Sequence, residues 1–244
     1  MSTSAKSEQR VSRWRVASGI AMALACLCLI YLLWLLCTVV WYNYQNPSMT
    51  PIMREQLMQL QAQDDSASLQ HRWVDYKQIS TSLKRAVVAS EDSGFVDHDG
   101  VEWDAIRQAW EYNQAQADSG SSRRRGGSTI TQQVAKNLFL SSSRSYLRKG
   151  QELLLAYMIE HVMSKERILE LYLNIAEWGV GVFGAEAAAQ HYYKRAAANL
   201  SSAQAARMAA MLPNPRYYDK HRSTSYLNSR VATLQKRMRM VEIP

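Results

Sequence analysis

This 244-residue sequence has only three cysteines, and their positions limit the structural and chemical roles that they can have. All three cysteines, Cys26, Cys28 and Cys37, lie within one apolar run, and residues 43–244 contain none. This absence excludes a disulfide framework and a thiolate metal site from the body of the protein. The five histidines do not cluster at metal-ligand spacing, so the histidine pattern predicts no metal centre.

Alternating apolar and polar residues, the pattern of half-buried strands, are also scarce. From about Tyr76 onward apolar residues recur at helical spacing instead, so we expect a mainly α body. Ser164 is expected to cap one of the helices, and Pro213 and Pro215 to stop the last. The expected helices cover SLKRAVVASED, EWDAIRQAWEYN, SYLRKGQELLLAYMIEHVM, SKERILELYLNIAEW, AEAAAQHYYKRAAA and SSAQAARMAAML, the first ending near Ser90.

One segment lacks charge altogether: Val16 to Tyr42 has 27 residues without a charged side chain, enough to cross a bilayer. Basic residues precede this segment, which by the positive-inside rule keeps the N-terminus cytoplasmic. They are Lys6, Arg10, Arg13 and Arg15. A cleaved signal peptide is the alternative, but its apolar core would be shorter and would end in small residues rather than TVVWYNY.

These features divide the chain into four parts. We expect a basic cytoplasmic tail at 1–15, a single transmembrane helix at 16–42, a juxtamembrane linker with a short helix at 43–75, and a globular domain at 76–244.

The net positive charge of the chain indicates which kind of binding partner to expect. The net charge is +8, and the tail holds four cations and one acid, so the rest of the chain keeps about +5. An excess of positive charge favours an anionic partner such as a lipid phosphate or a diphosphate ester. Because a membrane tether would hold the domain outside the cell, we expect no nucleic-acid partner.

The segment GGSTITQQVAKN opens a predicted helix with unusually polar residues. Thr129 and Gln132 fit a capping box, and a helix N-terminus favours phosphate. Capping needs one hydroxyl, whereas this turn also offers Ser128, Thr131 and a lysine, Lys136. Phosphate or sugar binding is one interpretation, and a well-capped surface helix is the other.

Two further segments carry charged groups that suit glycosyl chemistry. In RSYLRKGQE, the spacing places Arg144, Arg148 and Glu152 on one helix face, where arginines can hold a diphosphate. The alternative is a surface Arg–Glu ladder. In ASEDSGFVDHDG, adjacent Glu91 and Asp92 beside an aromatic can raise the pKa of one carboxyl and prepare a general base, with Glu152 as its partner. A solvated helix end is the alternative reading.

Three remaining patterns give weaker indications. Trp103, Ile106 and Trp110 form a helical stripe that we expect to pack in the core, the membrane interface being the alternative. ADSGSSRRRGG at 117–127 predicts a basic loop, either solvated or covering an anionic ligand. GVGVFG at 179–184 follows a helical segment, so we interpret it as a bend that lets backbones approach rather than as a dinucleotide site.

Four motifs in order resemble those of the bacterial peptidoglycan glycosyltransferase family, family 51, across about residues 75–215. They are Glu91-Asp92-x-x-Phe95-x-x-His98-x-Gly100, Gly127-Ser128-Thr129-x-Thr131-Gln132-Gln133-x-x-Lys136-Asn137, Arg148-Lys149-x-x-Glu152 and Lys165-x-x-Ile168-Leu169-Glu170-x-Tyr172-Leu173-Asn174. Two features depart from the family pattern: Glu102 stands where an aspartate is frequent, and NPRYYDKHRSTSYLNSR fits only loosely.

The resemblance implies a lysozyme-like, mainly helical domain with a smaller membrane-facing jaw. It implies polymerisation of lipid II into glycan strands at the outer face of the inner membrane. Glu91 would deprotonate the acceptor's 4-hydroxyl, which inverts the anomeric carbon and expels a lipid diphosphate. Lys136, Arg144 and Arg148 would stabilise that diphosphate, and Glu152 would position it or a divalent ion.

The resemblance also assigns supporting residues and partners. Ser128, Thr129, Gln132, Gln133 and Asn137 would contact the substrate, and Asp92, Phe95, His98 and Lys149 would support the site. No cofactor is required, although Mg²⁺ or Mn²⁺ near Glu152 stays open. Expected partners are lipid II, the growing lipid-linked strand, the bilayer and proteins of cell division or elongation.

Other activities have weaker support in the sequence. No S-x-x-K followed by K-T-G occurs, so a transpeptidase module is not expected. A wall-cleaving muramidase or lytic transglycosylase of related fold would need a glutamate but no diphosphate-binding cations. A non-catalytic scaffold would not need the motifs at all.

Overall fold

The computed structural model describes residues 2–121, 126–143 and 145–244. Arg144 and most of the basic loop, residues 122–125, therefore lie outside the described residues. The chain divides into two compact units, Met1–Tyr44 and Gln45–Pro244.

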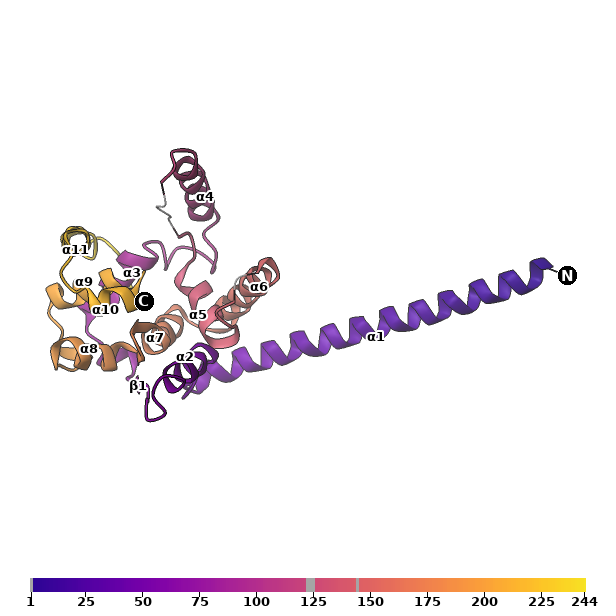
Figure 1. The fold of residues 1–244 in the computed structure, drawn as a ribbon, viewed down its shortest axis with the longest axis horizontal. Coiled ribbons are helices and arrows are strands. Elements are labelled where there is room, and N and C mark those ends of the chain that lie inside the picture. The colour runs from indigo at the N-terminus through magenta and orange to yellow at the C-terminus, as the bar shows by residue number, and fades with distance from the viewer. Residues whose placement is uncertain (1, 122–125, 144) are drawn as a thin grey trace. The chain divides into compact units, whose positions relative to one another are not determined.

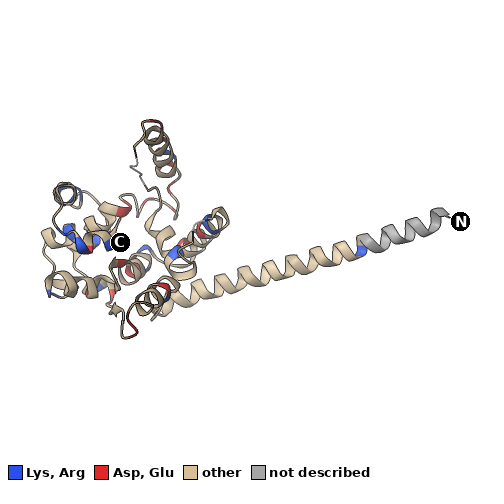
Figure 2. Cartoon of the chain, in the orientation of Figure 1, with Lys and Arg blue, Asp and Glu red and all other residues tan. Residues whose placement is uncertain are grey.

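The first unit is one helix, α1 (Ser2–Tyr44). Its stretch Trp14–Tyr44 has 31 residues and a mean hydropathy of 2.7, so it is long and apolar enough to cross a membrane. Figure 2 shows this part of α1 without a charged residue beyond its first turn. The helix fits a single-pass membrane anchor.

The second unit, hereafter the globular unit, is mainly helical, as predicted (Figure 1). Its strands β1, β3 and β2 form one small sheet in that order. The elements are α2 (Pro51–Gln61), β1 (Gln70–His71), η1 (Tyr76–Gln78), α3 (Thr81–Glu91), α4 (Trp103–Asp118), α5 (Ile130–Phe139), α6 (Tyr146–Val162), α7 (Lys165–Ile175), β2 (Glu177–Gly179), β3 (Val182–Phe183), α8 (Ala185–Tyr193), η2 (Ala197–Asn199), α9 (Ser202–Met211), α10 (Pro215–Lys220) and α11 (Ser225–Arg237).

Two groups of packed helices form the core of the globular unit. Helix α3 packs against α9 and α11, and α5 packs against α6 and α7. Large side chains between the elements are fully buried, among them Phe95, Tyr172, Trp178 and Phe183. Burial of this apolar surface holds the C-terminal end of α3 and the helices α5 and α6 in fixed positions.

Side-chain caps explain where several helices begin. The Ser164 hydroxyl accepts a hydrogen bond from the Arg167 N–H at the start of α7, as the sequence predicted. The capping box of Thr129 and Gln132 is also confirmed. These caps satisfy N–H groups that the first helical turn leaves without partners.

The segment interpreted as a linker, residues 43–75, instead belongs largely to the globular unit. Met53 of α2 is fully buried, and β1 pairs in parallel with β3, Gln70 opposite Val182. The Asn174 side chain bonds both the N–H and the C=O of Val74 at 2.9 Å. The compact unit therefore starts at Gln45 rather than at residue 76, because α2 packs against α5 and β1 pairs with β3.

The expectation that the tryptophan stripe of α4 packs in the core was also wrong. Trp103 is 55% exposed and Trp110 is 62% exposed. Ala109 is the one buried residue of this helix, and α4 projects from the other helices of the globular unit in Figure 1. Helical periodicity identified an apolar face without telling what covers it.

The glycine-rich bend at 179–184 joins β2 to β3 and brings backbones close together, as predicted. Gly184 has φ +83°, and a Cβ there would lie 2.8 Å from the carbonyl oxygen of Asn174. Only glycine adopts this conformation and this approach without strain.

Candidate active site

Glu91 is the last residue of α3 and is half-buried. One carboxylate oxygen accepts a hydrogen bond from the Ser90 hydroxyl at 3.0 Å, and the other accepts from the Gln133 amide at 3.2 Å. Arg230 of α11 donates to the same Ser90 hydroxyl at 3.0 Å. The carboxylate is thus held by groups from α3, α5 and, through Ser90, α11.

The surroundings of Glu91 suit a group that accepts a proton near neutral pH. Burial raises the pKa of Glu91, while hydrogen bonds from Gln133 and Ser90 and the charge of Arg230 oppose the rise. The net pKa lies above that of an ordinary glutamate. A carboxylate with a raised pKa is a stronger base, which is what general-base catalysis requires.

Asp92 has a different role from its neighbour because it faces the interior. Its carboxylate accepts from His98 Nε2 at 2.9 Å and from the N–H of Ile130 at 2.9 Å. His98 Nδ1 accepts from the N–H of Gly100 at 3.1 Å, so the neutral ring carries its proton on Nε2. Asp92 and His98 therefore tie the loop after α3 to the first turn of α5.

The charge state of His98 depends on the same contact. Burial disfavours the charged ring, but the hydrogen bond and the charge of Asp92 outweigh burial and raise the pKa of His98. Beside this pair, Phe95 is fully buried, and Lys165 Nζ lies 4.7 Å from its ring centroid. These residues support the loop that follows Glu91.

Two of the residues expected to contact substrate, Thr129 and Gln132, instead form hydrogen bonds within the protein. Thr129 Oγ1 donates to the carbonyl of Gly100 at 2.6 Å and accepts from the Gln132 N–H, while Gln132 Oε1 accepts from the Thr129 N–H. Both side chains are buried, as is Asn137. These contacts favour a structural role for Thr129 and Gln132: they fix the direction of α5.

Glu152 lies at the centre of a cluster of cations. Arg148 donates to one of its oxygens at 3.0 Å, and Lys149 forms an ion pair with the other. Lys149 also donates to the Ser128 hydroxyl at 3.1 Å, which links α6 to the segment before α5. Glu152 is only 4% exposed, so its charge is balanced by these neighbours rather than by water.

Lys136 of α5 borders this cluster. Burial lowers the pKa of Lys136, the charge of Glu152 partly restores it, and the charge of Arg148 lowers it further. Among the described residues, the Lys136 ammonium has no hydrogen-bond or ion-pair partner. A partly desolvated cation without an acceptor is suited to bind an anionic group of a ligand.

Helix α5 connects the two carboxylates. Gln133 bonds Glu91, and Lys136, one turn later on the same face, lies next to the cluster around Glu152. The structure thus brings together Glu91, Gln133, Lys136, Arg148, Lys149 and Glu152 along α5. Arg144 lies outside the described residues.

Sequence reasoning assigned no role at this site to three residues that contact it, although Tyr172 is part of a family motif. Ser90 and Arg230 hold Glu91, as described above, and the Tyr172 hydroxyl donates to the Gln133 amide oxygen at 3.3 Å. Ser90 is adjacent to Glu91 in the sequence and could have been considered. Arg230 could not, because it lies 140 positions from Ser90 in a segment that the motifs do not cover.

Two places offer groups that a divalent ion could use. The ligand atoms of Asp92, His98 and Glu102 lie within 4.8 Å of one another. The family resemblance left open a divalent ion near Glu152. Asp92 already accepts two donors, and both oxygens of Glu152 accept from cations. An ion at either place would share these oxygens with the donors already bound to them, because each carboxylate oxygen has two lone pairs.

Known proteins resemble this chain over most of its length. Residues 56–239 match the family described as transglycosylase. A biosynthetic peptidoglycan transglycosylase of Bordetella pertussis is 66% identical over 236 residues, 97% of this chain and 98% of that protein. Proteins of the same description from Herminiimonas arsenicoxydans (57% over 204 residues, 84% of this chain and 87% of that protein) and Methylobacillus flagellatus (49% over 231 residues, 95% and 97%) are also similar.

The family match covers the helices that carry Glu91, Lys136 and Glu152 as well as α11, which carries Arg230. The relatives match the chain over most of their own length. The chain belongs to the transglycosylase family.

Proposed function

We propose that this protein polymerises lipid II into peptidoglycan glycan strands. The observation that carries the proposal is that one helix, α5, joins a half-buried glutamate of raised pKa to a cluster of cations. The names of the relatives, biosynthetic peptidoglycan transglycosylases, support peptidoglycan as the polymer.

In this mechanism Glu91 removes the proton from the 4-hydroxyl of the acceptor sugar. A sugar hydroxyl is a weak nucleophile, so a positioned base is needed. The hydroxyl oxygen attacks the anomeric carbon of the lipid-linked donor, the bond to the diphosphate breaks, and the configuration inverts. The proton is left on Glu91, whose raised pKa favours its capture.

The leaving diphosphate takes the negative charge, and the cations of α5 and α6 stabilise it. Lys136 and Arg148 are the proposed contacts, with Arg144 as a further one and with Gln133 and Ser128 lining the approach. Fixed cations lower the barrier because they need not reorganise as charge develops. Glu152 lies between Arg148 and Lys149 and forms an ion pair with each, which holds both cations in place.

Membrane attachment fits a substrate with a lipid tail. We propose that α1 spans the inner membrane with the N-terminus in the cytoplasm and the globular unit in the periplasm. The exposed Trp103 and Trp110 of α4, with Tyr146 and Leu147 of α6, are proposed to form the membrane-facing jaw. Proteins of division or elongation are proposed partners, and no transpeptidase activity is expected.

The decisive experiment uses the full chain in detergent with labelled lipid II, followed by separation of the products on a gel. Wild type should yield a ladder of glycan strands, and Glu91→Gln should yield none while remaining folded. If wild type leaves lipid II unchanged across pH and metal conditions, the proposal is wrong. Release of soluble fragments from purified cell walls would instead indicate a wall-cleaving enzyme.

A further inference from the structure

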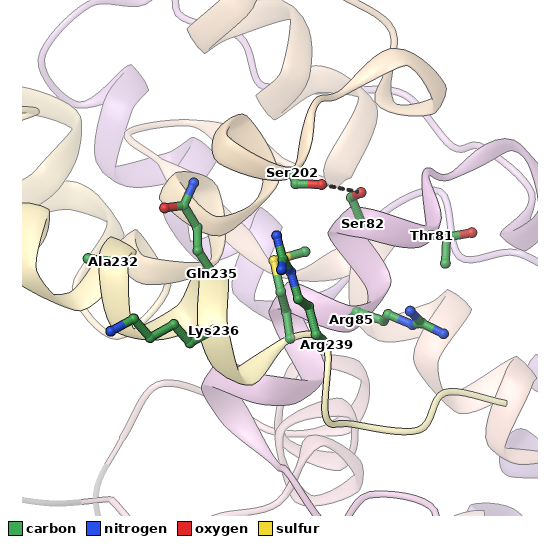
Figure 3. Close-up of a pocket in the computed structure, with 9 residues that line it drawn as sticks. Thr81, Ser82, Arg85, Ser202, Ala232, Gln235, Lys236 and Arg239 are labelled. Atoms are coloured by element: carbon green, nitrogen blue, oxygen red, sulfur yellow. Dashed lines mark hydrogen bonds between the residues drawn. The ribbon is translucent and has the colours of Figure 1, made fainter.

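A cavity among the described residues lies away from the candidate active site. It has a volume of about 440 Å³ and is bordered by the first turns of α3 and α9 and by the end of α11 (Figure 3). Along the axis of α3, the lining residues Thr81, Ser82 and Arg85 lie about 9–15 Å from Glu91, at 1.5 Å per residue. An occupant of this pocket would therefore not touch the proposed base.

The lining of the pocket is basic. Arg85, Lys236 and Arg239 line it, and none of the described lining residues is acidic. None of these three side chains has a hydrogen-bond or ion-pair partner among the described residues. Figure 3 shows the Arg239 side chain extending across the pocket between Gln235 and Arg85. In the part of the chain that the structure describes, no acidic side chain forms an ion pair with these three cations.

Hydroxyl groups complete the polar part of the lining. Ser82 and Ser202 are hydrogen-bonded to each other at 3.2 Å, which brings the first turns of α3 and α9 together. The N–H groups of Leu83 and Gln204 donate to the N-cap hydroxyls of Ser80 and Ser201, whereas those of Ser82 and Ser202 have no acceptor within their helices. The buried Met238 and the small Ala232 form the apolar part of the lining.

We propose that this pocket binds a phosphate group that carries a small organic substituent. A phosphate monoester has a charge between about −1.5 and −2 at neutral pH, and arginine matches its oxygens with paired donors. The volume falls in the range of about 300–1,000 Å³ that is typical of small-molecule sites, and it exceeds the need of a bare phosphate. The headgroup of an anionic lipid such as phosphatidylglycerol is a phosphodiester, which has one negative charge but offers phosphate oxygens to the same arginine donors.

Amide chemical shifts of the isotope-labelled full chain in detergent would test this directly. Titration with glycerol 3-phosphate, at constant ionic strength, should give saturable shifts at the N–H groups of Ser82 and Ser202. The double variant R85Q/R239Q should bind at least about tenfold more weakly, because each arginine supplies a charge-assisted contact. Both arginines are exposed, so the variant should remain folded, and an unchanged spectrum elsewhere would verify this.

Two matched control variants test whether the chemical-shift changes arise from binding in this pocket. Arg54→Gln removes an exposed cation outside the pocket and should leave the titration unchanged. Lys136→Gln removes a cation of the candidate active site and should also leave the shifts at Ser82 and Ser202 unchanged. Absence of saturable shifts, or equal affinity in R85Q/R239Q and wild type, would overturn the proposal.

A second arm identifies the source of the phosphate. The full chain in nanodiscs with phosphatidylglycerol should show the same shifts, relative to phosphatidylcholine alone, if the group belongs to a lipid. Shifts with glycerol 3-phosphate but not with phosphatidylglycerol would identify the ligand as a soluble phosphate ester. Absence of shifts in both experiments would refute the proposed binding site. The result does not depend on whether lipid II is polymerised.

Discussion

The Gln133 side-chain amide on α5 donates a hydrogen bond to the Glu91 carboxylate at the end of α3, with Nε2 and Oε2 3.2 Å apart. Three residues further along α5, Lys136 borders the cations around Glu152. One helix therefore sets the separation between the proposed base and the proposed diphosphate site. The predictions below test the parts of this arrangement one at a time.

Glu91→Gln is expected to lower the polymerisation rate by at least about 10²–10⁴, the usual contribution of a general base. Because burial disfavours the charge of Glu91, the neutral amide should leave the melting temperature equal to or above that of wild type. The exposed Asp65→Asn is the control and should retain full activity. Turnover of Glu91→Gln at the wild-type rate would reject Glu91 as the base.

The acid side of the pH–rate profile should report the ionisation of Glu91. The base must be deprotonated, so the rate falls as the pH drops through its pKa. Arg230 lowers the pKa of Glu91, so Arg230→Gln should move this fall to higher pH. Arg237→Gln, two turns later on α11 and exposed, should leave the profile unchanged. A profile of Arg230→Gln that coincides with wild type would contradict the proposed coupling.

Lys136→Gln is expected to lower kcat/KM for lipid II by about 10²–10³, the cost of losing one group that stabilises transition-state charge. Lys136→Arg keeps the charge and should recover part of the loss. Since burial lowers the pKa of Lys136, the wild-type rate should also fall on the alkaline side below the usual range of lysine. Equal steady-state kinetics for Lys136→Gln and Lys220→Gln, a change of an exposed lysine, would remove Lys136 from the site.

Thr129 should matter for stability because it caps α5 and bonds Gly100. Thr129→Ala is expected to lower the free energy of unfolding by about 1–2 kcal/mol. Thr129→Ser keeps the hydroxyl and should stay within about 0.5 kcal/mol of wild type. Denaturant unfolding of the detergent-solubilised chain measures both. An alanine variant as stable as wild type but with a raised KM would favour substrate binding instead.

Removal of divalent cations should leave polymerisation unchanged. Both oxygens of Glu152 accept from Arg148 and Lys149, so an ion would meet two positive charges. The rate should be the same after exhaustive chelation and after re-addition of Mg²⁺ or Mn²⁺. Loss of activity on chelation, restored by either ion, would show that a metal takes part.

Local sequence signals predicted the helices well, because their caps and apolar periods act within a few residues. The capping box of Thr129 and Gln132 and the Ser164 cap are such signals. The glycine bend could also be predicted from the sequence, since the positive φ of Gly184 depends on that one residue being glycine.

Contacts between segments that are distant in the chain could not be predicted from such local signals. No local pattern indicated that Arg230 reaches Ser90, or that Gln70 pairs with Val182, because each contact joins segments more than 100 residues apart. The apolar period of α4 likewise identified a face without identifying what covers it, so Trp103 and Trp110 were expected in the core. Such positions depend on packing that a single sequence does not encode locally.

The pairing of β1 with β3 has a practical consequence for preparing a soluble fragment. A shortened chain that starts at Tyr76 would lose the strand that pairs with β3, and with it α2, which packs against α5. The freed strand edge would be open to other molecules and would promote aggregation. Crystallisation trials without the anchor should therefore begin the polypeptide at Gln45.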